Sequence, residues 1–254
     1  MEFIVLLIII IISYIILRII FEVNFKKIKQ ISENKELDEI TQKYPENVEI
    51  CKWYLKKLKN ENVKIEEDKK SNATLYLVIS NKIFIANLKD SYTRIQTIAH
   101  ECLHSIQSKK MLWFNFIFSN IYLIYFAIIF ILGIAKVLPN KMIFVSIYII
   151  LSLIYYAIRT YLENDAMIKA RFLAKEYMMK LKISDENEID KIIKTYDELN
   201  EIGIKAINFQ FLSNIFLKLG ILLIIFIIRW LKKHMQDLKY VVILRIKKIF
   251  MVKV

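Results

Sequence analysis

Four long apolar runs limit what this chain can fold into. They cover residues 3–21, 112–135, 142–158 and 211–230, and the first contains five consecutive isoleucines. At a rise of 1.5 Å per residue, a helix of about 20 residues crosses the hydrocarbon core of a bilayer. Because that core offers no water to backbone N–H and C=O groups, each run is expected to be helical. The sequence therefore predicts a mainly α, integral membrane fold with three to four transmembrane helices.

Composition and charge agree with this class. Hydrophobic residues make up 56% of the 254 residues, whereas soluble domains contain about 45–50%. The formal net charge is +13, and the basic residues gather beside the apolar runs, as at Lys109 and Lys110. This pattern favours membrane lipids as partners and argues against nucleic acid. Two cysteines, Cys51 and Cys102, are too few for a disulfide framework.

The apolar runs and the polar stretches between them divide the chain into six expected segments. These are an N-terminal transmembrane anchor (1–21), a soluble segment (22–110), a transmembrane hairpin (111–158), a charged helical segment (159–210), a C-terminal transmembrane helix (211–231) and a basic tail (232–254). The first run lacks a basic start and a small-residue cleavage site, which predicts an uncleaved anchor. Pro139 and Asn140 are typical of the turn inside a hairpin.

The soluble segment shows patterns for two helices with a strand pair between them. Apolar residues recur at helical spacing over residues 46–60, which predicts a helix with one buried face. The short β-branched and aromatic runs 74–79 and 82–86 favour a hairpin, or a strand that leads into a loop. Asp90 and Ser91 offer N-cap chemistry to the helix that follows.

That second helix carries the motif with the most specific chemistry. His100, Glu101 and His104 form an H-E-x-x-H pattern, which contains two of the three histidines in the chain. Positions i and i+4 share one face of a helix, so the two imidazoles can converge on one Zn²⁺ ion. Glu101 then stands beside the metal as a candidate general base. The alternative is two surface histidines on a polar helix turn.

A catalytic zinc site needs a third protein ligand and one open position. His234 lies beyond the fourth apolar run, so a carboxylate is the better candidate. Glu163 follows the hairpin, which returns the chain to the side of the membrane that it left. Glu163 is therefore expected to meet the two histidines, and the alternative role is a solvated carboxylate at the membrane surface.

Other polar residues near the motif have roles that the sequence leaves open. Asp165 could orient a ligand histidine, or pair with Lys169 or Arg159. Cys102 could be a redox-sensitive neighbour of the metal or a small apolar filler. Three residues are possible donors to an oxyanion, and nothing selects among them: Tyr161, Arg171 and His234.

Three stretches carry a resemblance to a known family: I-A-H-E-C-L-H-S-I-Q at 98–107, V-I-S-N-K-I-F at 78–84 and E-N-D-A at 163–166. They are similar to the A-H-E-x-G-H-A-x-Q zinc helix, to the strand and loop before it, and to the E-x-D-A after a membrane hairpin in the YugP-like bacterial membrane zinc metallopeptidases. The likeness follows the same order of segments over residues 1–230. Leu103 stands where the family usually has Gly.

The resemblance implies a zincin-like α+β catalytic part of the gluzincin type, with Zn²⁺ held by His100, His104 and Glu163. It also implies a membrane-bound endopeptidase that hydrolyses peptides or membrane proteins with zinc-activated water and Glu101 as general base. The expected location is the bacterial cell membrane, as a multi-pass protein. The alternative is a catalytically silent zinc-binding membrane scaffold or partner-binding protein, which the unusual Leu103 suggests.

The orientation in the membrane rests on the positive-inside rule. Basic residues flank the zinc motif and Glu163, which places the catalytic side in the cytoplasm. Four crossings would then place the basic tail 232–254 outside, against the same rule. Either the run 211–230 does not cross fully, or the orientation is reversed.

Overall fold

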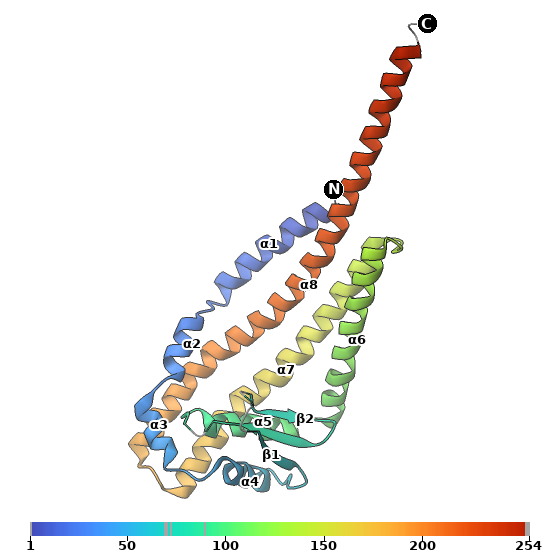
Figure 1. Ribbon diagram of the computed structural model, residues 1–254. Coiled ribbons are helices and arrows are strands. Elements are labelled where there is room, and N and C mark those ends of the chain that lie inside the picture. Colours follow the sequence, from blue (N-terminus) through green and yellow to red (C-terminus); the bar gives the residue numbers. More distant parts are fainter. Residues whose placement is uncertain (1, 69–70, 72, 89, 252–254) are drawn as a thin grey trace.

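The computed structural model describes residues 2–68, 71, 73–88 and 90–251, and it is mainly helical with one small sheet. Four helices are long and apolar enough to cross a membrane: α1 (Glu2–Ile20), α6 (Lys109–Ala135), α7 (Lys141–Leu181) and α8 (Glu186–Met251). The shorter elements form a lobe at one end of these helices (Figure 1). This confirms the prediction of a mainly α chain, and the four candidate spans agree with the three to four transmembrane helices that were expected.

The long helices run alternately toward and away from the lobe (Figure 1). They pack through a core that includes Tyr122, Ile129, Tyr148 and Phe226, while many isoleucines face outward. Helices α6 and α8 approach closely at Gly133. A Cβ added there would lie 3.1 Å from Cε1 of Phe226. Small residues that allow such contact are typical of helix pairs in membranes. The apolar outer surface therefore suits lipid and the inner faces suit helix packing.

The expected segment boundaries after residues 158, 210 and 231 do not interrupt the backbone. Helix α7 continues past residue 158 to Leu181, and α8 continues through residues 210 and 231 to Met251. Neither helix contains proline, so a change from apolar to charged residues alters the surroundings without breaking the helix. The fourth run thus lies inside one long helix, which favours a full crossing. Of the expected basic tail, residues 252–254 lie outside the described residues.

The lobe contains four helices and three strands: α2 (Phe25–Ser32), α3 (Lys35–Gln42), α4 (Asn47–Lys57), β1 (Lys64–Asp68), β2 (Leu75–Leu77), β3 (Lys82–Ala86) and α5 (Arg94–Ile106). The sheet order is β1-β3-β2, with β1 parallel and β2 antiparallel to β3. The expected hairpin is therefore present as β2 and β3, and β2 lies at an edge. Strand β1 was not predicted, because its sequence K-I-E-E-D has one apolar residue and is mostly exposed.

The predicted face of α4 lies in the core of the lobe. Ile50, Cys51 and Tyr54 are fully buried there against α5 and α7. Cys51 and Cys102 are free thiols whose Sγ atoms are 3.6 Å apart, so Cys102 serves as a small core residue. Leu103 is 6% exposed and belongs to the same core. The residue that departs from the family pattern therefore packs inside the lobe.

The start of α5 differs from the expected N-cap at Asp90 and Ser91. The cap residue is Thr93, whose side chain makes no capping hydrogen bond, and α5 begins at the buried Arg94. The Arg94 guanidinium donates to the carbonyls of Pro45, Thr41 and Tyr44 and to Oδ1 of Asn47, at 2.8–2.9 Å; its side chain joins α5 to the α3–α4 corner. Tertiary contacts made by Arg94, rather than a local cap, position this end of the helix.

We expect Arg94→Met to destabilise the protein by about 3 kcal/mol, because four buried acceptors would lose a charged donor. Equilibrium unfolding in detergent measures the change. Lys175→Met is the matched control, because Lys175 pairs with Asp190 at 2.8 Å on an exposed surface; it should cost less than about 1 kcal/mol. Equal stability of the two variants would contradict the proposed role of Arg94.

The arrangement of the long helices predicts which segments share a side of the membrane. The turn between α6 and α7 and the far end of α8 lie away from the lobe (Figure 1). Reporter fusions at Leu138 and Tyr240 should therefore report one side, and a fusion at Asn60 the other. A reporter at Tyr240 on the same side as the one at Asn60 would show that α8 does not cross.

Candidate metal centre

Helix α5 presents the motif residues to α7. His100 and His104 are one helical turn apart, and their Nε2 atoms lie 2.9 Å from each other. The rings meet edge to face, with centroids 4.5 Å apart. Both imidazoles therefore aim one nitrogen at the same point, as the i, i+4 spacing predicted.

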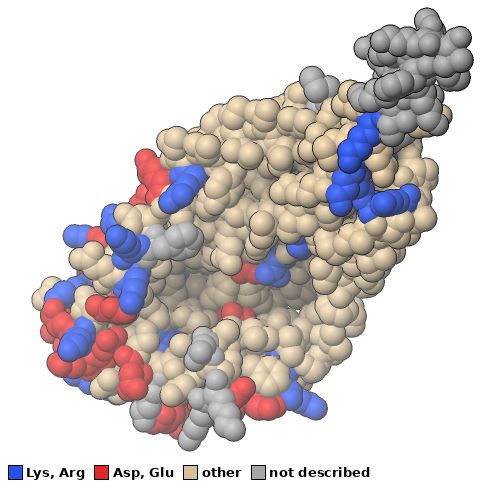
Figure 2. Space-filling model, turned by 45° about the horizontal axis from the view of Figure 1, so that its top comes forward, with Lys and Arg blue, Asp and Glu red and all other residues tan. Residues whose placement is uncertain are grey.

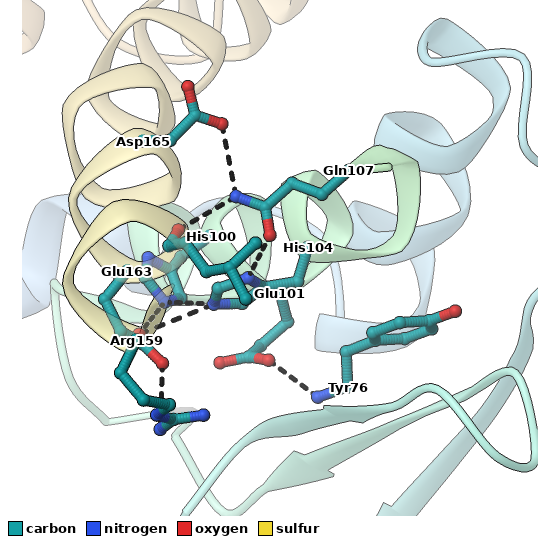
Figure 3. A network of polar contacts seen from close by, with 9 residues as sticks. Tyr76, His100, Glu101, His104, Gln107, Arg159, Glu163 and Asp165 are labelled. Carbon is teal, nitrogen blue, oxygen red and sulfur yellow. Dashed lines mark hydrogen bonds and ion pairs between the residues drawn. The ribbon is translucent and has the colours of Figure 1, made fainter. Parts of the chain in front are cut away.

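Helix α7 brings Glu163 to this point (Figure 3). Its Oε2 atom lies 3.4 Å from Nε2 of His100 and 3.5 Å from Nε2 of His104. Tetrahedral zinc with bonds of about 2.0–2.1 Å holds its ligand atoms about 3.3 Å apart. Both carboxylate distances match this spacing, and the imidazole nitrogens need to separate only slightly. The three side chains thus fit a small metal ion with N, N and O donors.

A second carboxylate stands at the same place. Ligand atoms of His100, Glu101 and His104 all lie within 4.8 Å of one another, so this cluster could hold a metal ion. The backbone N–H of Tyr76 donates to Oε2 of Glu101 at 2.6 Å and holds this carboxylate toward β2. The hydrogen bond leaves Glu163 as the carboxylate that faces both imidazoles.

Glu101 lies in a buried environment, with 8% of the residue exposed. Burial raises the pKa of its carboxyl above the ordinary value, although His100, His104 and the Tyr76 amide oppose the rise. A carboxylate with a raised pKa is a better proton acceptor near neutral pH. Its surroundings therefore suit a general base.

Gln107 orients the ring of His104. Its Oε1 lies 2.9 Å from Nδ1 of His104, and its Nε2 donates to the Leu162 carbonyl at 2.8 Å and to Asp165 at 3.1 Å. Because both amide hydrogens are donated to oxygens of α7, the amide is held with Oε1 toward His104. Oε1 can then accept the Nδ1 proton. His104 is then left with its Nε2 lone pair pointing at the metal position, which is the usual arrangement of a ligand histidine.

Asp165 combines the two roles that the sequence left open. Its Oδ1 pairs with Nζ of Lys169 at 2.5 Å, which is the expected i, i+4 bridge. Its Oδ2 accepts from Gln107 and so acts on His104 only through that amide. The contact with Arg159 is not formed, because Arg159 pairs with Glu163 instead, Nη2 to Oε1 at 3.1 Å.

The expected oxyanion donors all lie elsewhere. Tyr161 is 61% exposed, and Arg171 pairs with Asp197. His234 stacks on Trp230 near the far end of α8, at 5.2 Å between ring centroids. None of the three lines the cleft beside the motif. These three residue types can donate a hydrogen bond to an oxyanion, but the fold places them away from the cleft.

A cleft of about 470 Å³ opens onto Glu101, His104 and Glu163. Residues 74–79, which include β2, form one wall, and α6 forms another through residues that include Asn115 and Ser119. In Figure 2 charged side chains gather over the lobe, mostly uncharged residues cover the long helices, and a hollow lies between the two. The cleft thus lies between the lobe and a membrane helix.

Sequence reasoning missed three residues of this site: Tyr76, Gln107 and Arg159. Gln107 and Arg159 had local signals, since Gln107 ends the resembling stretch and Arg159 lies four residues before Glu163. Tyr76 had none, because it acts through its backbone N–H at a sheet edge.

A scan against protein-family models, a search of curated proteins and a search of solved structures find no match. The resemblance of residues 78–84, 98–107 and 163–166 to a metallopeptidase family therefore stays a prediction.

We expect Gln107→Leu to weaken zinc binding about 10- to 100-fold, because His104 would lose the partner that fixes its tautomer. Competition with a chromogenic chelator measures the affinity. Lys169→Met is the control, since it removes the exposed partner of Asp165 but leaves the Gln107 amide in place. If the two variants bind zinc equally well, Gln107 does not orient the ligand.

Proposed function

We propose that this protein is a membrane-bound zinc-dependent endopeptidase. One observation carries the proposal: the triangle formed by Nε2 of His100, Nε2 of His104 and Oε2 of Glu163, with Glu101 beside it. Two imidazoles and one carboxylate with an open side are the donor set of catalytic zinc sites in peptidases. The resemblance to YugP-like metallopeptidases points to the same chemistry.

His100, His104 and Glu163 would hold the metal, and the remaining steps belong to other residues. A zinc ion supplies a water molecule whose pKa is lowered to about 7 and polarises a carbonyl oxygen. Glu101 takes a proton from the attacking water and gives it to the leaving amine. The Tyr76 N–H keeps the Glu101 carboxylate on the cleft side of the motif.

The cleft supports an extended peptide as substrate. Strand β2 is the edge of the sheet and pairs with β3 on one side only. Apart from the Tyr76 N–H, which already donates to Glu101, this edge can offer backbone groups to another extended chain, whose alternate side chains can enter pockets. The opposite wall is α6, so the bound peptide would lie next to the membrane. Peptides and membrane proteins cut close to the bilayer surface are the substrates that we infer.

The protein would act in a bacterial cell membrane, with lipids around its four long helices. We propose that the lobe faces the cytoplasm, because basic residues flank the lobe ends of α1, α6 and the apolar part of α7. If α8 crosses fully, the basic residues after 231 lie outside, so this orientation gives more weight to the three basic clusters at the lobe. The reporter at Asn60 tests this assignment, and an external signal there would reverse it.

The scaffold alternative was suggested by the unusual Leu103. The Leu103 side chain packs in the lobe core and does not line the cleft, so it does not obstruct the proposed site. A scaffold would bind zinc without turnover, so the two functions are separated by a cleavage assay.

We expect the purified protein in detergent to bind one zinc ion and to cleave an unfolded test protein. Glu101→Gln should keep the zinc and lose about 10²- to 10⁴-fold in kcat, because the proton acceptor is removed. Glu163→Ala should lose the zinc. Metal content by elemental analysis and cleavage by gel assay measure the two effects.

Glu176→Gln is the control, since Glu176 lies on the same helix as Glu163 and pairs with Lys57 on the surface. It should retain both zinc and cleavage. Full cleavage by a zinc-loaded Glu101→Gln protein would disprove the mechanism, and a zinc-loaded wild type without turnover would favour the scaffold.

A further inference from the structure

Arg159 is the one arginine or lysine among the described residues that line the cleft. It lies on α7 one helical turn before Glu163, just beyond the apolar run 142–158. The sequence pointed to other residues for the stabilisation of negative charge, and the structure places those outside the cleft. The cleft therefore has a cation whose role in the proposed reaction is unassigned.

The guanidinium of Arg159 is held from two sides. Nη2 contacts Oε1 of Glu163 at 3.1 Å, and Cζ lies 5.3 Å from the centroid of the Phe211 ring on α8. The side chain is 32% exposed and lines the cleft. An ion pair and an aromatic face thus fix the group without covering it.

The two carboxylate oxygens of Glu163 contact different partners. Oε1 faces Arg159, while Oε2 faces His100 and His104. Arg159 and the two histidines therefore contact the two oxygens of the same carboxylate (Figure 3). A group bound at the open side of the proposed metal triangle would lie near the guanidinium.

Arg159 also has donors to spare. A guanidinium carries five N–H donors in a planar fork, and one contact with Glu163 engages a single nitrogen. Nε is buried without a hydrogen-bond partner among the described residues. The guanidinium therefore keeps N–H donors for a second partner.

We propose that Arg159 is a catalytic residue that donates a hydrogen bond to the oxyanion of the tetrahedral intermediate. This role rests on the proposed peptidase function. As the water oxygen bonds to the carbonyl carbon, the C=O π pair moves to the carbonyl oxygen and the water proton goes to Glu101. When the C–N bond breaks, its electron pair goes to nitrogen, Glu101 returns the proton there, and C=O re-forms. Negative charge on the carbonyl oxygen exists only between these steps.

The expected effect follows from that timing. A donor that meets charge present only in the intermediate raises kcat and changes substrate binding little. Loss of one oxyanion donor lowers kcat about 10²- to 10³-fold in other hydrolases. A residue that only orients Glu163 would instead change zinc affinity, with normal kcat once zinc saturates the site.

The test compares Arg159→Met and Arg159→Lys with the wild type at saturating zinc. An internally quenched peptide with blocked ends gives kcat and KM. A phosphinic peptide, whose tetrahedral anion mimics the intermediate, gives binding by calorimetry without turnover. Arg171→Met is the matched control, because Arg171 lies on the same helix but pairs with Asp197 away from the cleft.

We expect Arg159→Met to lose about 10²- to 10³-fold in kcat with KM within about threefold of wild type, and to bind the phosphinic peptide weaker by a similar factor. Arg159→Lys should recover part of both losses, since a charged donor remains. Arg171→Met should match the wild type.

Two results would overturn the role of Arg159. Normal kcat and phosphinic-peptide binding in zinc-saturated Arg159→Met would reduce the residue to a positioning partner of Glu163. A defect that appears only in KM, and only for peptides with a free C-terminus, would assign the guanidinium to a substrate carboxylate. A wild type that neither cleaves the peptide nor binds the phosphinic analogue would instead disprove the peptidase function itself.

Discussion

The site depends on the meeting of Glu163 with His100 and His104 across two elements that are far apart in the sequence. A carboxylate that is only 16% exposed is costly to bury unless positive or metal partners surround it. Arg159 on α7 provides a positive partner, and a metal ion held by the two imidazoles of α5 would provide another. Ala166 and Ala170 are fully buried on α7, and their small side chains let the neighbouring elements approach. The candidate metal site therefore depends on the continuation of α7 from the apolar region into the lobe.

The contacts around the metal position also join the lobe to the membrane helices. Gln107, at the end of α5, binds His104 and two oxygens of α7 at the same time. The Tyr76 N–H couples the sheet edge to Glu101 in the same way. Gln107 and Tyr76 thus each form a hydrogen bond to a helix or strand other than their own. Movement of the lobe relative to α7 would thus disturb the positions of His104 and Glu101 together.

Local sequence patterns predicted most of the helices and the β2–β3 hairpin. The features that they did not predict depend on tertiary contacts. Helical spacing placed His100 and His104 on one face, and the return of a hairpin brought Glu163 toward them. Strand β1 escaped prediction because pairing with β3, not its own residues, makes it a strand. The start of α5 depends on the buried Arg94, for which no capping rule exists. Arg159 needed both the Glu163 contact and the cleft before a role could be assigned to it.

The position of the cleft is compatible with the proposed hydrolysis in a largely apolar protein. Glu163 and Arg159 lie just beyond the apolar part of α7, and the motif helix belongs to the lobe. The wall that α6 contributes includes Asn115 and Ser119, which lie within hydrogen-bond distance of each other at 3.4 Å. Polar groups in a membrane helix are favourable where they face a cavity that water can enter. The cleft therefore gives water access to Glu101, and in the proposed reaction α6 would keep the substrate beside the bilayer.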